Sequence, residues 1–216
     1  MLRLQPIVLP LDCVRNQPEV IPAIVSACQW GQVEAENRPR SNRPRIYRGT
    51  EAYFETIEAL CSSLMPLGFE RQEKQNQVRL LSPVRDGEEQ YRLLACRGKV
   101  VGSNITVNPK GYLTQKLVNE DNWHYVPHLS IFPTEELPPK NIWVIYDNER
   151  LPEGDIILTV TLAMPYPLTH SGTLFECQDT ETLYCGPLVQ YTASLEDVPE
   201  GVSIEVVINE NTGTDS

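Results

Sequence analysis

The 216-residue sequence has no apolar run near the roughly 20 residues that a membrane-spanning helix needs. Its first residues are only mildly apolar, and Gln5, Pro6 and Pro10 interrupt them before they reach the length of a secretory signal. We therefore expect a cytoplasmic protein with no membrane partner. The six cysteines stand far apart and form no C-x-x-C pair, so we expect reduced, mostly buried thiols and no disulfide framework.

The sequence also lacks the short motifs that mark common catalytic and nucleotide-binding sites. It contains no G-x-x-x-x-G-K-[ST] phosphate loop, no G-x-G-x-x-G dinucleotide fingerprint and no G-x-S-x-G nucleophile elbow. These absences favour a protein that is not an enzyme, and we expect no cofactor.

Basic residues are nearly missing from the second half of the chain. Residues 117–216 hold 2 Lys and Arg against 17 Asp and Glu, a net charge of −15, whereas residues 1–116 carry a net charge of +4. The formal charge of −11 therefore conceals a basic front half and an acidic rear half. Such an asymmetry concerns partners and solubility, and it does not determine the fold.

Composition and periodicity favour an α+β fold with a short helical section at the front. The 18 prolines favour turns and short strands over long helices. Apolar residues at helical spacing predict helices over about 19–31 and 50–65, the second with Thr50 as its N-cap. A β-meander is predicted over 77–107, with Asp86-Gly87 as a hairpin turn.

The chain is expected to form two lobes. Residues 1–118 make the basic α+β lobe, and the proline-rich stretch 119–141 connects it to an acidic lobe over 142–208. Regularly spaced short strands with turn residues between them predict that this second lobe is antiparallel, β-rich and sandwich-like. The tail 209–216 has no apolar anchor and is expected to be mobile.

An arginine-rich run between the two helices is the main candidate for binding. Residues 37–48 contain five arginines and no acidic residue, and Pro39 and Pro44 favour an extended, exposed linker. A guanidinium group can donate a forked pair of hydrogen bonds to a phosphate, and an aromatic ring can stack on an unpaired base. The candidate binding residues are Arg38, Arg40, Arg43, Arg45, Tyr47 and Arg48, joined by Arg79, Arg97 and Lys99 of the meander.

These cations admit three interpretations. They can hold RNA or single-stranded DNA, they can hold an acidic protein surface, or they can pair with the acidic rear half of the same chain. Arg79 and Arg97 would strengthen the first two interpretations if they share one face of the sheet.

A histidine pair suggests a metal-dependent alternative. His124 and His128 follow two acidic residues and are four positions apart, as zinc ligands on a helix are. Pro127 opposes helical backbone before it, and in an extended segment the two histidines stand roughly 13 Å apart, too far to share one ion. We expect no metal, and the pair remains a candidate only if a tight turn brings both residues together.

These patterns together predict a non-enzymatic subunit or accessory factor of a larger assembly. Its arginine-rich segment contacts RNA, single-stranded DNA or an acidic protein partner, and its acidic half faces another protein or keeps the complex soluble. One alternative is a protein-only structural or adaptor component, such as part of a virion, a tail or a secretion complex. A second is a metal-dependent hydrolase built around the histidine pair.

Overall fold

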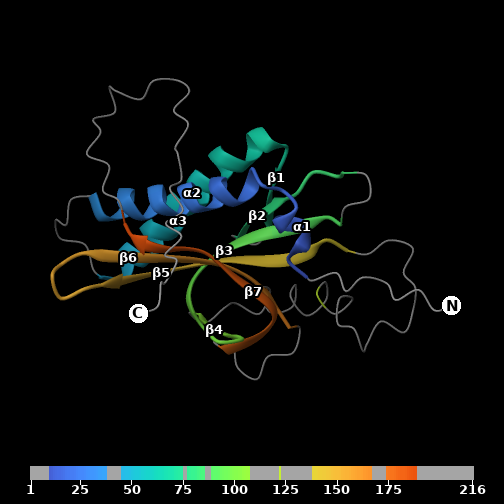
Figure 1. Ribbon diagram of the computed structural model, residues 1–216. Coiled ribbons are helices and arrows are strands. Elements are labelled where there is room, and N and C mark those ends of the chain that lie inside the picture. Colours follow the sequence, from blue (N-terminus) through green and yellow to red (C-terminus); the bar gives the residue numbers. More distant parts are fainter. Residues whose placement is uncertain are drawn as a thin grey trace, which may run out of the picture.

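The computed structural model describes residues 10–37, 45–74, 77–85, 89–107, 122, 138–166 and 174–188. For residues 45–49, 74 and 174 it describes the backbone alone. Within these ranges a helical section precedes a mixed sheet of seven strands, which confirms the predicted α+β class (Figure 1).

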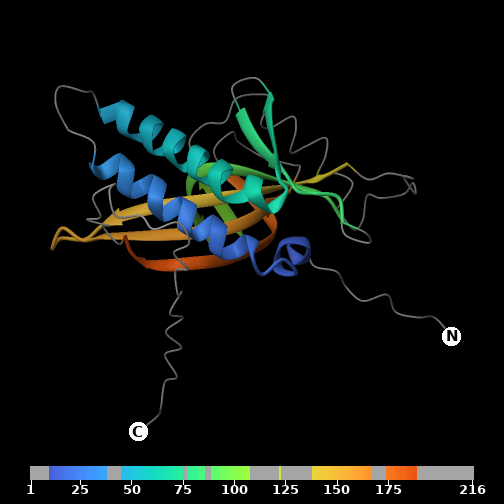
Figure 2. The same ribbon diagram turned by 90° about the horizontal axis from the view of Figure 1, so that it is seen from above.

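The helical section consists of α1 (Asp12–Arg15), α2 (Val20–Asn37), α3 (Arg45–Leu64) and the 3-10 turn η1 (Met65–Leu67). The long helices α2 and α3 lie side by side and antiparallel on one face of the sheet (Figure 2). No helix in the described ranges is both long and apolar enough to cross a membrane.

Both predicted long helices exist, but each extends beyond its predicted bounds. α2 continues past Gly31, where a helix end had been expected. A Cβ atom built on Gly31 would lie 2.5 Å from the Cα atom of Thr56 in α3, so the glycine allows the helices to approach. Close packing therefore offsets the cost of a glycine inside a helix, which is about 1 kcal/mol.

The predicted extended linker over 37–48 is wrong at its two ends. Asn37 is the last residue of α2, and α3 begins at Arg45 instead of after Thr50. Pro44 precedes the helix directly, a position that proline tolerates because the first helical N–H groups need no intrahelical partner. Arg45, Tyr47 and Arg48 consequently belong to a helix.

The seven strands of the described chain are β1 (Glu70–Lys74), β2 (Gln77–Leu81), β3 (Tyr91–Val101), β4 (Asn104–Val107), β5 (Lys140–Arg150), β6 (Ile156–Pro165) and β7 (Leu174–Pro187). Their hydrogen-bonded order is β1-β2-β3-β4-β7-β6-β5, and β3 also pairs in parallel with β5. Because β5 pairs back to β3, the strands β3, β4, β7, β6 and β5 form a closed ring. β1 and β2 extend the sheet outside that ring.

The predicted meander differs from the structure in two details. β1 was not predicted because its side chains are all polar or charged, which is common on an edge strand and shows no apolar alternation. The last part of the meander is divided between β3 and β4 by a turn at Gly102, whose φ of +60° favours glycine. The predicted turn at Asp86-Gly87 lies outside the described residues.

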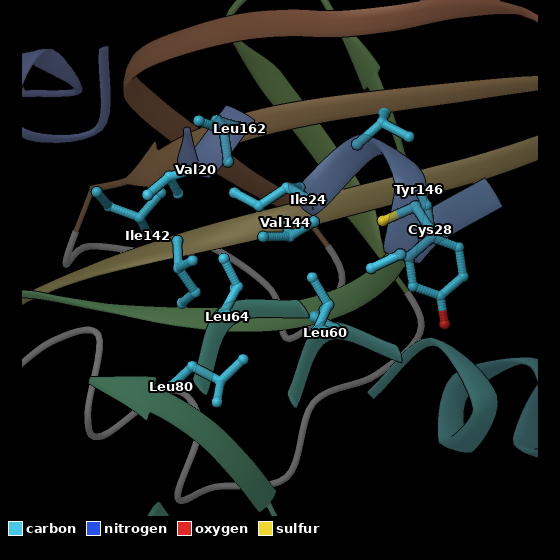
Figure 3. Close-up of a cluster of buried hydrophobic side chains, with 14 of the residues drawn as sticks. Val20, Ile24, Cys28, Leu60, Leu64, Leu80, Ile142, Val144, Tyr146 and Leu162 are labelled. Atoms are coloured by element: carbon cyan, nitrogen blue, oxygen red, sulfur yellow. The ribbon is translucent and has the colours of Figure 1, made fainter. Parts of the chain in front are cut away.

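Two apolar clusters lie on opposite faces of the sheet. The outer cluster lies between the helices and the sheet, and Figure 3 shows α2, α3, β2, β5 and β6 contributing side chains to it. The inner cluster lies within the ring, where the rings of Trp143 and Phe175 meet edge to face with centroids 4.7 Å apart. Alternation along β5 serves both clusters, because Ile142 and Val144 face the helices while Trp143 and Ile145 face the ring.

Strands from both predicted lobes share this sheet. β3 precedes the expected connection 119–141 and β5 follows it, yet Tyr91–Arg97 pairs with Lys140–Tyr146. Of the connection itself the structure describes residue 122 and residues 138–141. The Asn122 amide donates to the carbonyl groups of Asn141 and Pro165 at 3.1 and 3.0 Å, which ties the start of β5 to the end of β6. That the two lobes fold separately stays a prediction.

A buried polar chain joins the two helices to β5. The Asn148 amide donates to the side-chain oxygen of Gln32 at 2.7 Å, and the Gln32 amide donates to the Thr56 hydroxyl at 2.9 Å. That hydroxyl in turn donates to the carbonyl group of Ala52 at 2.7 Å. The helix pair is therefore fixed to the sheet by directed hydrogen bonds as well as by apolar packing.

Replacing Gly31 by alanine tests the close approach of α2 and α3. The new Cβ would collide with backbone atoms of Thr56, so we expect the free energy of unfolding to fall by about 1–3 kcal/mol despite the better helix propensity of alanine. Urea denaturation followed by circular dichroism measures the change. Ser26→Ala on the same helix is the control and should have a small effect. Equal or greater stability of Gly31→Ala would contradict the packing described.

Candidate functional site

The arginine-rich segment joins two packed, antiparallel helices. α2 ends at Asn37 and α3 begins at Arg45, so both ends of the intervening segment 38–44 are fixed at the same end of the helix pair (Figure 2). Arg38, Arg40 and Arg43 lie outside the described residues. Arg45, Tyr47 and Arg48 lie in the first turns of α3, where the backbone alone is described.

The start of α3 is electropositive for two reasons. A helix N-terminus carries about half a positive elementary charge and presents N–H groups without intrahelical partners. Arg45 and Arg48 add two cations to the first turns, and the first turn of α3 has no acidic residue to offset them. Cations are unfavourable at this end of a helix, so an anion bound here would relieve the repulsion.

The three cations predicted from the meander do not form one surface. Leu80 of β2 pairs with Leu93 of β3, so by alternation Arg79 and Arg97 lie on opposite faces. The condition that these two arginines share one face of the sheet is therefore not met. Arg79 is only 4% exposed, so a phosphate could reach it only if the surrounding chain moved, whereas Arg97 and Lys99 are exposed.

Arg97 has a structural neighbour on the helix-covered face. It pairs with Tyr146 across the β3–β5 ladder. Burial raises the pKa of the Tyr146 phenol, and the positive charge of Arg97 partly opposes that rise. The phenol is therefore neutral at physiological pH.

Internal pairing with the acidic rear half occurs at Arg15, which the sequence did not single out. Its Nε atom donates to Glu181 at 2.6 Å and its Nη1 atom to Asp179 at 3.0 Å, both on β7. Burial lowers the pKa of the Arg15 guanidinium, but the hydrogen bonds to Asp179, Glu181 and Asp12 raise it further, so the net shift is upward. These contacts fasten α1 to the sheet at the start of α2.

A second ion pair links the halves at the other end of α2. Arg150 at the end of β5 donates to Glu36 at 3.0 Å, one residue before α2 ends. The turn between β5 and β6 therefore lies at the same end of the helix pair as the arginine-rich segment. Exposed acids flank this turn: Glu149, Glu153 and Asp155.

A polar pocket of about 270 Å³ opens where the inner face of the ring becomes polar. Ile145 of the inner cluster lines it, and the next inward positions of β5 are Asp147 and Glu149. Threonines of β6 and β7 form the adjoining wall, and the backbone stretch from Gly98 to Val100 of β3 borders the pocket. By alternation the Lys99 side chain lies on the other face of β3, the same face as Arg97. Thr-x-Thr and Asp-x-Glu patterns are ordinary on strands, so no sequence signal distinguished these residues.

The six cysteines of the chain are all free, and five of them are buried, which confirms the sequence prediction. Burial raises the pKa of Cys13 to about 11 and the pKa values of Cys28 and Cys177 to about 12. Cys185 on β7 is exposed, and its Sγ atom lies 3.6 Å from the hydroxyl oxygen of Thr159, which lines the pocket. Cys185 therefore marks the edge of the pocket.

The predicted histidine pair lies outside the described residues, as do Glu120 and Asp121. Within the described ranges, no group of three or more His, Cys, Asp or Glu side chains could hold a metal ion. The metal-dependent alternative thus gains no support from the part of the chain that is described.

Comparisons with known proteins assign no family to the chain. No family model matches it, and neither the curated proteins nor the solved structures contain a significant match. The candidate sites must therefore be judged on their own geometry and chemistry.

Alkylation of the folded protein should distinguish Cys185 from the other cysteines. At about pH 8, we expect iodoacetamide to modify one thiol per chain, because the other five thiols are buried, and the raised pKa values of Cys13, Cys28 and Cys177 also keep these three protonated. Intact-protein mass spectrometry counts the adducts. The Cys185→Ser variant should stay unmodified until urea unfolds it. Rapid modification of several thiols in the folded wild type would contradict the burial described.

Proposed function

We propose that this protein is a non-enzymatic, nucleic-acid-binding subunit of a larger assembly, which holds single-stranded RNA or DNA with the arginine-rich segment 38–48. One observation carries the proposal. The last residues of the segment form the first turn of α3, so Arg45 and Arg48 lie at the positive end of a 20-residue helix. Two arginine positions and the first N–H groups of the helix occur together there, and both groups suit phosphate.

The anchoring of the segment also favours binding. Both of its ends are held by helices that pack on each other and on the sheet, so fewer chain conformations are lost when a ligand is bound. Forked guanidinium groups add directed hydrogen bonds to phosphate oxygens, and Tyr47 supplies an aromatic ring for stacking on an unpaired base.

The two acids of β7 that pair with Arg15 lie far from the segment. Asp179 and Glu181 hold Arg15 beside the start of α2, and the 18 residues of α2 separate that point from the segment by about 27 Å. The nearer acids are those flanking the β5–β6 turn, which the Arg150–Glu36 ion pair brings to the same end of the helix pair. In the proposal, these acids compete weakly with nucleic acid for the arginines.

The salt dependence of binding tests the proposal. Fluorescence anisotropy with labelled oligouridylate and oligothymidylate measures the Kd at several salt concentrations. We expect log Kd to rise with log salt at a slope of about 3 to 4 for five phosphate contacts. Replacing all five arginines by alanine should flatten the slope, whereas the matched replacement by lysine keeps the charge and should preserve most of it. The residues replaced are Arg38, Arg40, Arg43, Arg45 and Arg48.

Neutralising the nearby acids should change the affinity for nucleic acid in the opposite direction. The triple change Glu149→Gln, Glu153→Gln and Asp155→Asn should tighten binding at low salt, because it removes competing carboxylates near the segment. Absence of binding by the wild type at low salt would overturn the nucleic-acid proposal. Stable association with a protein that survives nuclease treatment would favour an acidic protein partner instead.

A further inference from the structure

We infer that the outer edge of β1 is a self-association surface, at which two copies of this chain pair their β1 strands antiparallel and join their sheets into one. The inference does not depend on the nucleic-acid proposal, because β1 and the arginine-rich segment use different residues. Its basis is a strand edge that no described strand covers and a charge sequence that is complementary to itself.

β1 is the last strand on one side of the described sheet. All five of its residues pair with β2, and within the described ranges no strand pairs with its other edge. The β1–β2 hairpin extends away from the closed ring (Figure 2). A strand edge presents N–H and C=O groups that can pair with a further strand, so such edges are common sites of association between chains.

The sequence of β1 selects one antiparallel register with its own copy. The strand reads Glu70, Arg71, Gln72, Glu73, Lys74. When the twofold axis passes through Gln72, all five residues are paired. Glu70 then stands opposite Lys74 of the second copy, and Arg71 stands opposite its Glu73. Every charged position of the strand therefore meets the opposite charge, an arrangement that stabilises cross-strand pairs.

Neighbouring registers lack this match. A slip of one residue turns the side chains of the two strands to opposite faces. A slip of two residues sets Arg71 against Arg71 in one direction and Glu73 against Glu73 in the other, and like charges directly opposite are destabilising. Charges on an edge strand oppose pairing with a foreign strand, but here the second copy supplies the counter-charges.

Contacts on the helix-covered face favour pairing there. Arg71 pairs with Leu80 of the outer cluster, so Arg71 and Glu73 share the face that lies toward α3. The Nη1 and Nη2 atoms of Arg71 lie 3.2 Å from Glu58 and 2.7 Å from Glu73. Both acidic side chains remain more than half exposed and can accept further bonds. In the paired register these charges form a network across the axis, which is more stabilising than an isolated surface pair.

An exposed apolar side chain lies on the same side of the hairpin. Phe54 is 58% exposed and precedes Glu58 by about one helical turn, so both residues project from the same face of α3. The twofold axis of two antiparallel edges is perpendicular to the sheet, so both copies carry their helices on the same face of the joined sheet. The exposed face of α3 therefore adds apolar area to a ladder of five residues, which alone buries little.

Sedimentation equilibrium of the full chain, freed of nucleic acid by nuclease treatment, tests the inference. We expect a reversible shift from the 24.5 kDa monomer to a dimer as the concentration rises from about 1 to 500 μM, because so small an interface is weak. About 0.15 M salt screens the repulsion between two chains of charge −11 beyond contact distance. A monomer at every concentration would overturn the inference.

Charge-reversal variants test the register. Arg71→Glu and Glu73→Arg each set like charges against one another twice per dimer, so either change alone should weaken the dimer at least about tenfold. An equimolar mixture of the two variants restores both opposite-charge pairs and should form a heterodimer about as tight as the wild-type dimer. Arg150→Glu makes the same change in net charge at another exposed ion pair, and this control should dimerise as the wild type does. Undiminished dimerisation of Arg71→Glu, or no recovery on mixing, would contradict the pairing.

A cysteine on the twofold axis gives a measurement that does not depend on charge. In a Cys185→Ser background, which lacks the exposed native thiol, Gln72→Cys should form a disulfide-linked dimer under mild oxidation. The reason is that residue 72 stands opposite its own copy, with Cβ atoms about 5 Å apart. Glu70→Cys should not cross-link, because its copy lies roughly 13 Å away along the strand. Non-reducing electrophoresis separates the products, and equal cross-linking of both variants, or none with Gln72→Cys, would overturn the assigned register.

Discussion

The two-sided burial of β5 is the constraint on which the rest of this structure depends. Residues 140–146 are buried and pair with β3, and from Trp143 onward the strand also pairs with β6 on its other side. Side-chain alternation then directs Val144 toward the helices and Trp143 into the ring. Burying large apolar side chains on both faces stabilises the fold by an amount that surface contacts do not reach.

The same alternation continues after the apolar residues end. Asn148 points to the helices and joins the hydrogen-bonded chain through Gln32 and Thr56, while Asp147 and Glu149 point inward and form part of the pocket. The pocket is thus the polar continuation of the inner cluster, and the Gln32 network is the polar continuation of the outer one. A single strand, β5, positions both.

In the fold, ion pairs join the basic front half of the chain to its acidic rear half. Arg15 and β7 hold the start of α2 to the sheet, and Glu36 and Arg150 hold its end. Front-half and rear-half charges therefore meet at both ends of one helix. The arginine-rich segment follows that helix in the sequence, and the Arg150–Glu36 ion pair holds the β5–β6 turn, with its exposed acids, at the same end of α2.

Part of this fold and part of the candidate site could be predicted from the sequence. The apolar stripe of α3 and the alternation in β3 were sufficient to predict a helix and a strand. The continuation of α2 past Gly31 could not be predicted, because it depends on the approach of Thr56 from another helix. Arg79 and Arg97 were grouped by type, but the ladder register placed them on opposite faces.

The sequence by itself determined the α+β class, the free thiols, the arginine-rich segment and the separation of charge along the chain, because these follow from composition and local periodicity. Only the tertiary structure decided that β3 pairs with β5, that Arg15 binds the acids of β7, and that Asp147 and the threonines of β6 and β7 line one pocket. Those contacts join residues distant in sequence. No local pattern encodes which distant strands will pair, since pairing is settled by how the whole chain buries its apolar side chains.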